Sequence, residues 1–293
     1  MSTESLYSRD GSKIVFDIAG NGPTIILLHG LSQYRELWHR YGWFDELAAT
    51  HTVIAPDIRG AGDSEAVVDK HGHDIRRYIG DVEALISHSG NPNAIVWGWS
   101  FGGAVALQVA ARSRRISAVI ASGTHFGCIF TTETIEKRLA DLAAVEKAAK
   151  SGAWDGIPEQ RRITAERTDF DAARARLRAL HEWPTVEPYD IGVGALVISG
   201  ENDGRNAALL RERSAAIERA GIDLHVFDEL NHVDLVARRD VVSPLIHRFL
   251  AGIAQAEDGL PPDHVDHGKP KIARTPLAGS GRSFEGAVRA AVE

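Results

Sequence analysis

The chain has 293 residues, of which 44% are hydrophobic and 25% are charged, as in an ordinary soluble globular protein. Its net charge is −7 and no lysine and arginine run dominates a segment, which argues against a nucleic-acid-binding surface. The single cysteine, Cys128, excludes an internal disulfide and a thiolate metal cluster, so we interpret it as a small packing residue.

Short apolar runs alternate with helical patterns along the chain. The runs predict buried strands at 13–18, 24–28, 52–55, 94–97, 117–121, 195–199 and 224–227. Such continuous runs are typical of a parallel sheet that helices cover on both faces. Apolar residues at helical spacing predict helices at 74–88 and 104–111, and a similar stripe recurs from Val242 to Leu250. We therefore predict an α/β fold with a mostly parallel central sheet and helices on both faces.

The long stretch between Ser122 and Ala195 interrupts this alternation. It has no strand pattern, and helical patterns occur at 132–150 and 171–181. We interpret 126–190 as a helical cap inserted into a core formed by 1–125 and 191–254. A pair of ordinary sheet-covering helices with a long loop is the alternative. Residues 255–293 lack apolar periodicity, which predicts an irregular or mobile tail with a short helix at 283–292.

One motif has a specific chemical meaning. Ser100 occupies the centre of Gly98-Trp99-Ser100-Phe101-Gly102, a G-x-S-x-G pattern between an apolar run and a helical pattern. At a sharp strand-to-helix turn, such a serine has its hydroxyl exposed above the sheet, close to a helix N-terminus. The two glycines lack a Cβ, so strand and helix can approach closely there. Because the pattern also occurs by chance, it needs catalytic partners elsewhere in the chain.

Further motifs follow the predicted strands. They are His29-Gly30, the segment 57–64, Gly200-Glu201-Asn202-Asp203, and Asn231-His232. With the serine motif, they make the chain from about Ser5 to Leu250 resemble the α/β-hydrolase superfamily. The resemblance implies a catalytic triad in the chain order serine, acid, histidine, on loops at the C-terminal ends of strands. In this chain those residues are Ser100, Asp203 and His232.

The implied chemistry is nucleophilic catalysis. A neutral serine hydroxyl is a poor nucleophile, so His232 would take the proton of Ser100 while Asp203 holds the imidazole in place. The resemblance also places the two backbone N–H donors of an oxyanion hole at Leu31 and Phe101. The rivals of Asp203 for the acid role are Glu201, Asp228 and Asp234.

Other polar residues have structural interpretations. We interpret His29 as a scaffold residue of the oxyanion loop, and Asp57 and Arg59 as turn residues, with Asp57 accepting backbone N–H groups. The run His71-Gly72-His73-Asp74 hints at a metal site but lacks a fourth ligand at useful spacing. We therefore predict neither a metal nor a cofactor.

These observations favour a serine hydrolase. We expect it to cleave a carboxylic ester or lactone of a small, mostly apolar substrate through an acyl-enzyme on Ser100. A carbon–carbon bond hydrolase or a cofactor-free perhydrolase with the same triad is an alternative, and a non-catalytic ligand-binding protein on this fold is another. A serine nucleophile argues against epoxide hydrolases and haloalkane dehalogenases, which resemble this family but place an aspartate there.

The substrate pocket is the least defined part of the prediction. Its candidates are Trp99, Phe126, Trp154, Trp183 and Val233. The aromatic residues at 126, 154 and 183 either wall an acyl pocket or pack the cap helices, and both readings stay open. A small-molecule substrate is the partner we predict, and the oligomeric state stays open, a homodimer included.

The first residues lack the basic start and apolar core of a secretory signal. No apolar stretch approaches the roughly 20 residues that span a bilayer. The sequence therefore predicts a cytoplasmic protein without a membrane span.

Overall fold

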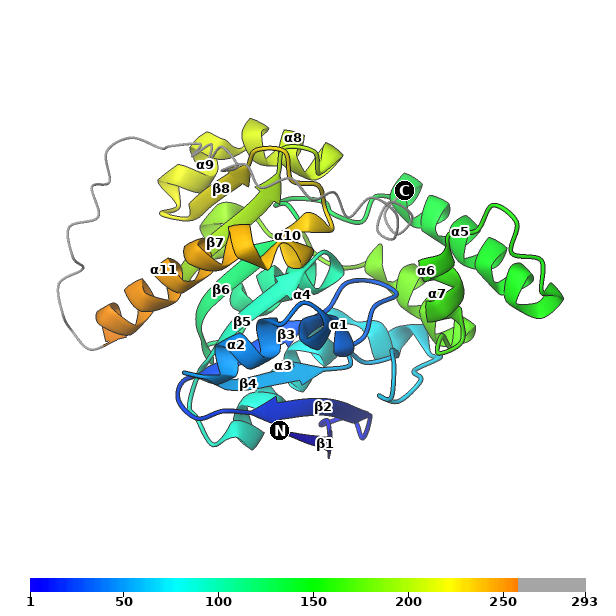
Figure 1. Cartoon of the computed structure of the whole chain (residues 1–293), viewed down its shortest axis with the longest axis horizontal. Coiled ribbons are helices and arrows are strands. Elements are labelled where there is room, and N and C mark those ends of the chain that lie inside the picture. The colour runs from blue at the N-terminus through cyan, green and yellow to red at the C-terminus, as the bar shows by residue number, and fades with distance from the viewer. Residues whose placement is uncertain (258–293) are drawn as a thin grey trace.

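The computed structural model describes residues 1–257, so the predicted tail beyond 257, with its helix at 283–292, lies outside the described residues. The centre of the molecule is an eight-stranded sheet in the order β1-β2-β4-β3-β5-β6-β7-β8 (Figure 1). The strands are β1 (Ser2–Tyr7), β2 (Lys13–Ala19), β3 (Thr24–Leu28), β4 (Thr52–Pro56), β5 (Ala94–Trp99), β6 (Ile116–Ser122), β7 (Gly194–Gly200) and β8 (Asp223–Phe227). β1 and β2 run antiparallel to their neighbours, and all pairs from β4 to β8 are parallel.

Helices cover both faces of this sheet. They are α1 (Glu36–Arg40), α2 (Trp43–Ala48), α3 (Ile75–Ser89), α4 (Phe101–Ala110), α5 (Thr132–Ser151), α6 (Glu159–Ala165), α7 (Phe170–Leu180), α8 (Gly204–Glu212), α9 (Ser214–Arg219), α10 (Asp234–Ala237) and α11 (Arg239–Glu257). Two short 3-10 helices, η1 (Lys70–His73) and η2 (Pro188–Asp190), complete the described elements. None of the described helices combines the length and the hydropathy that crossing a lipid bilayer requires.

Two buried clusters, one on each side of the sheet, hold the layers together. In β3, Ile26 and Leu28 belong to a cluster shared with α3 and α4. Ile25 and Leu27 belong to a second cluster, shared with α1, α2 and α11. Successive residues of a strand point to opposite faces, so a strand that is apolar throughout supplies both clusters. The predicted α/β architecture is confirmed.

The elements between β6 and β7 are all helical. α5, α6 and α7 follow one another there, and Figure 1 shows them grouped at one end of the molecule. Thr131 caps the start of α5, and Gly152, with φ of 73°, ends it. The domain boundaries at 126 and 190 stay a prediction. At the other boundary, α11 continues to Glu257, past the predicted end of the core at 254.

Candidate active site

Ser100 lies at the sharp turn between β5 and α4, as the motif predicts. Its backbone has φ of 58° and ψ of −116°, a strained conformation for a residue with a side chain. The Ser100 N–H donates to the carbonyl of Ser122 at 2.8 Å, which holds the turn against β6. A Cβ added at Gly98 would lie 1.9 Å from the carbonyl oxygen of Gly102. The turn therefore requires glycine at position 98, and a Cβ at Gly102 would lie 2.0 Å from the carbonyl oxygen of Leu28 in β3.

A direct hydrogen bond joins His232 and Asp203. The imidazole Nδ1 donates to Asp203 Oδ1 at 2.7 Å, and the two side chains are only 13% and 5% exposed. The Asn206 amide donates to the same carboxylate oxygen at 3.2 Å, and the Ser199 hydroxyl donates to Oδ2 at 3.4 Å. With the ring proton on Nδ1, Nε2 is the atom that can accept a proton. Asp203 thus orients the histidine as an acid partner must.

His232 also faces the nucleophile turn. Ser100 and His232 line the same two cavities. The indole N–H of Trp99 donates to the carbonyl of His232 at 2.9 Å, and their rings lie 5.1 Å apart. A Cβ at Gly123 would lie 2.9 Å from His232 Cε1, so glycine leaves room for the imidazole. The structure therefore brings the three predicted triad residues to one site.

Two of the rival acids have other partners. Glu201 forms an ion pair with Arg211. Asp234 Oδ2 accepts the N–H of Asn231 at 2.9 Å, within the turn that presents His232. Asp203 is the acid bonded to the imidazole, which favours Asp203 over these two rivals for the acid role.

His29 supports the loop that carries the predicted oxyanion donor Leu31. Its Nδ1–H donates to the carbonyl of Gly30 at 2.8 Å, and its Nε2 accepts the N–H of Ile58 at 2.9 Å. Burial lowers the pKa of His29 to about 3, so the ring is neutral. A neutral ring is what these two bonds require, because one nitrogen donates and the other accepts. His29 is a scaffold residue, as the sequence indicated.

The predicted oxyanion donors come from two different elements. Phe101 is the first residue of α4, and the N–H groups of a first helical turn have no acceptor within the helix. Leu31 follows Gly30 and lines both cavities together with Ser100. Their positions are compatible with a pair of donors beside the serine, and that role remains a proposal.

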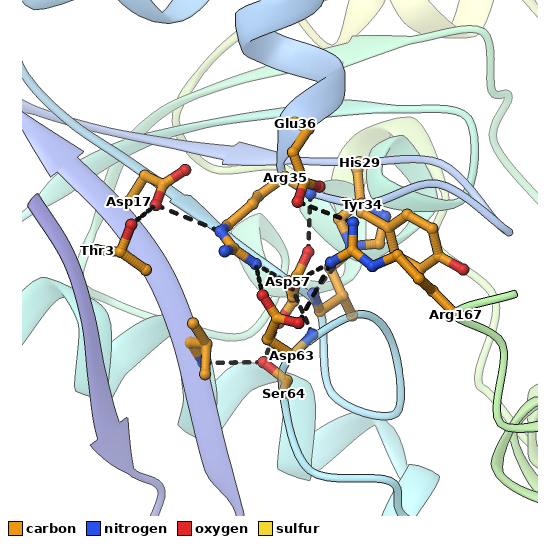
Figure 2. A network of polar contacts seen from close by, with 12 residues as sticks. Thr3, Asp17, His29, Tyr34, Arg35, Glu36, Asp57, Asp63, Ser64 and Arg167 are labelled. Atoms are coloured by element: carbon orange, nitrogen blue, oxygen red, sulfur yellow. Dashed lines mark hydrogen bonds and ion pairs between the residues drawn. The ribbon is translucent and has the colours of Figure 1, made fainter. Parts of the chain in front are cut away.

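A polar network holds Arg35, four residues after Leu31, against Asp57 and Asp63 (Figure 2). Asp57 accepts the backbone N–H of Arg35 at 2.8 Å and that of Asp63 at 2.9 Å, and it also pairs with the Arg35 guanidinium. Arg35 reaches Asp17 of β2 at 3.3 Å. Asp57 therefore accepts backbone N–H groups, as the turn interpretation expected.

The same network extends to the inserted helices through Arg167, which lies between α6 and α7 (Figure 2). Arg167 donates to Glu36 at 2.8 Å and to Asp63 at 3.4 Å. Its guanidinium also lies over the ring of Tyr34, 4.4 Å from the centroid. These contacts join the connection between α6 and α7 to the loop beside Ser100.

Two cavities, of about 270 Å³ and 810 Å³, meet at the serine. Their shared lining is Leu31, Ser100, Thr134, Lys137, Arg138 and His232. Of the predicted pocket residues, Trp99 lines the smaller cavity and Val233 the larger. Much of the remaining wall of the smaller cavity is charged, with Arg161, Arg167 and Arg176 from the inserted helices and their connection.

The other three predicted pocket residues do not line either cavity in the described part of the chain, which corrects the prediction. Phe126 is fully buried in the core. Trp183 packs against the rings of Tyr78 and Phe101, and its indole N–H donates to the carbonyl of His73 at 2.9 Å. Trp154 follows α5 and is half-buried. The side chains of Phe126 and Trp183 therefore pack against other residues and do not wall a pocket at Ser100.

Both ring nitrogens of His73 form hydrogen bonds within the protein. Its Nε2–H donates to the carbonyl of Val67 and its Nδ1 accepts from the Tyr78 hydroxyl, each at 2.8 Å. Burial lowers the pKa of His73 to about 4. Among the described residues, no group of three or more histidine, cysteine or acidic side chains could hold a metal ion.

Comparison with known proteins identifies the family of this fold. The profile of the alpha/beta hydrolase fold family matches residues 23–177. A soluble epoxide hydrolase from a Corynebacterium species is 38% identical over 117 residues, which are 39% of this chain and 40% of that protein. The chain thus matches well under half the length of that curated relative.

Solved structures extend the likeness over most of the chain. The bottromycin epimerase BotH is 25% identical with a TM-score of 0.67, over 85% of this chain and 100% of its own. An enol-lactonase from Burkholderia xenovorans is 23% identical with a TM-score of 0.68, over the same shares. Since the family profile matches more than half of the chain, the protein belongs to the alpha/beta hydrolase fold family.

Proposed function

We propose that the protein is a serine hydrolase that cleaves a carboxylic ester or lactone through an acyl-enzyme on Ser100. The observation that carries this proposal is the hydrogen bond from His232 to Asp203, with Ser100 held in a strained turn in the same cavity. These are the nucleophile, base and orienting acid that acyl transfer needs.

In the proposed reaction, the Ser100 hydroxyl oxygen attacks the substrate carbonyl while His232 Nε2 takes the hydroxyl proton. The resulting oxyanion accepts hydrogen bonds from the N–H groups of Leu31 and Phe101. Collapse of this intermediate breaks the bond to the alcohol oxygen, which takes the proton from the imidazolium. Water, activated by the same histidine, then attacks the acyl-serine ester and releases the acid. Asp203 stabilises the imidazolium in both halves.

The serine hydroxyl also argues against epoxide opening. Attack of a serine oxygen on an epoxide carbon gives an ether, which has no carbonyl for water to attack, so turnover would stop. Acylation gives an ester instead, which the same base and oxyanion donors can hydrolyse. The named epoxide hydrolase matches only part of this chain, and the nucleophile decides the chemistry we propose.

The direct test is hydrolysis of p-nitrophenyl acetate and butyrate. We expect the wild type to be active and Ser100→Ala to lose at least about 1,000-fold in kcat/KM, because the nucleophile is gone. Ser151→Ala, on the exposed end of α5, is the matched control and keeps wild-type activity. A fluorophosphonate probe should label the wild type but not Ser100→Ala.

Background hydrolysis by both wild type and Ser100→Ala would overturn the esterase proposal and favour a ligand-binding protein. A panel of esters, lactones and vinylogous diketones, with product identification, separates ester cleavage from the carbon–carbon bond alternative.

A further inference from the structure

The smaller cavity beside Ser100 has an excess of positive charge. Its lining holds five cationic side chains, Lys137, Arg138, Arg161, Arg167 and Arg176, and two acidic ones, Asp141 and Asp169. Asp169 accepts the N–H of Ala172 at 2.8 Å and so caps α7. Arg167 pairs with Glu36 and Asp63, outside this lining. Carboxylates outside the lining thus neutralise Arg167, and the four other cations still outnumber the two acids that line the cavity.

Arg176 is the most unusual of these cations. It is 4% exposed, and its Nε is buried without a hydrogen-bond partner. Its Nη1 reaches the carbonyl of Gly60 only at 3.4 Å, and its guanidinium lies 5.7 Å from the ring of Phe101. Among the described residues, no carboxylate pairs with it. A buried, unpaired guanidinium is costly to a fold, so its presence beside the nucleophile needs a reason.

The charge state of Arg176 follows from the same surroundings. Burial lowers the pKa of its guanidinium, and no carboxylate among the described residues offsets that shift. Even so, arginine stays protonated in proteins at neutral pH. Arg176 therefore places a full positive charge at the cavity, and no carboxylate of the described residues forms an ion pair with it.

The other cations surround the same space. Lys137 and Arg138 lie on α5 and line both cavities at the serine, and Arg161 of α6 reaches the Ser32 hydroxyl only at 3.5 Å. The ion pairs within the described part of these helices involve other residues. Three separate helices thus direct unpaired positive charge toward one small space.

We propose that this site takes substrates that carry a carboxylate, and that Arg176 binds that carboxylate while Ser100 attacks the ester or lactone carbonyl. This inference rests on the proposed function and replaces the expectation of a mostly apolar substrate. A guanidinium matches the planar carboxylate through two parallel N–H bonds, and Nε with one Nη can supply them. Lys137, Arg138 and Arg161 attract the anion to the entrance.

The test compares acids with their isosteric amides. One series is the mono-p-nitrophenyl esters of dicarboxylic acids of six to eight carbons, against the same esters with a terminal amide. The second series places the carboxylate or the amide on the alcohol side of the ester, as in 4-carboxyphenyl and 4-carbamoylphenyl butyrate. We expect kcat/KM to favour the acid by about 30-fold or more in one series, because a site built for a polar partner discriminates strongly against its loss.

Arg176→Met should remove most of this acid-over-amide preference, leaving a ratio below about 3-fold. Arg178→Met is the matched control, since Arg178 is exposed on the same helix, and it keeps the wild-type ratio. Equal rates on acids and amides in both series would overturn the inference while leaving the proposed function intact.

Two measurements on the wild type do not depend on how the variant folds. Adipate should raise Tm and competitively inhibit p-nitrophenyl butyrate hydrolysis, whereas adipamide should do neither. If no ester is hydrolysed, the proposed function fails, and the Tm rise with adipate still decides whether the anion site exists. A larger rise with inorganic phosphate than with adipate would overturn the assignment to a carboxylate.

Discussion

At the scale of single residues, the site depends on the hydrogen bond that orients the imidazole of His232. The Asp203 carboxylate accepts the Nδ1 proton and is itself held by Asn206 and Ser199. This arrangement sets the tautomer that leaves Nε2 free to accept a proton. Loss of the charge at position 203 should therefore affect catalysis more than folding.

We expect Asp203→Asn to lower kcat for p-nitrophenyl butyrate by roughly 1,000-fold to 10,000-fold, because an amide can stabilise the wrong tautomer. Glu201→Gln, on the same loop, is the control and should change kcat by less than about 3-fold, since Glu201 pairs with Arg211. Comparable losses in the two variants would contradict the assignment of Asp203.

The places of the three candidate triad residues were predictable at this scale, whereas the cavity wall was not. Ser100, Asp203 and His232 each follow an apolar run, so their place at strand ends can be inferred from the sequence. Arg176 gives no such signal, because an arginine in a helical pattern usually faces solvent. Its burial depends on how α7 packs against α5 and η1, which a single sequence does not specify.

At the scale of elements, the strands could be predicted from the sequence more completely than the helices. The seven predicted strands all occur, with ends that differ by at most a few residues. β1 was missed because it is an edge strand whose residues are mostly exposed, so it has no apolar run. α6 and α8 were missed because they have short patterns with little buried surface. α4 begins at Phe101, earlier than predicted, because glycines mask its first turn.

The start of α3 offers a test of local stability. The Asp74 carboxylate accepts the N–H of Arg76 at 2.9 Å and so caps the helix. We expect Asp74→Ala to lower the free energy of unfolding by about 1 kcal/mol in urea denaturation. Asp74→Ser retains a capping oxygen and should recover most of that loss. An equal loss in both variants would mean that the ion pair with Arg76, rather than the cap, supplies the stability.

At the scale of the whole molecule, two buried histidines make stability depend on pH. Burial lowers the pKa of His29 to about 3 and that of His73 to about 4, against 6.5 for each group's ordinary value. In this interval the unfolded chain binds protons that the folded chain does not. The contribution of the two neutral histidines to the free energy of unfolding is therefore complete above pH 6.5. It is lost as the pH falls toward their pKa values in the folded protein.

We expect each histidine to reduce the free energy of unfolding by about 1.4 kcal/mol per pH unit below pH 6. His73→Gln keeps a donor for Val67 and an acceptor for Tyr78 but does not titrate, so its decline from pH 6 to pH 5 should be shallower than that of wild type by this amount. His181→Gln, at an exposed position, should follow wild type. Urea denaturation at each pH measures the difference, and parallel curves for His73→Gln and wild type would contradict the prediction.

The helical insert between β6 and β7 also divides the reactive groups along the chain, with Ser100 before it and Asp203 and His232 after it. Synthesis runs from the amino end, so the hydroxyl leaves the ribosome well before the imidazole has been made. A polypeptide that ends before residue 232 has the Ser100 hydroxyl but lacks the His232 imidazole that would accept its proton. The proposed acyl transfer would thus become possible only late in translation, once the loops that follow β7 and β8 have been made.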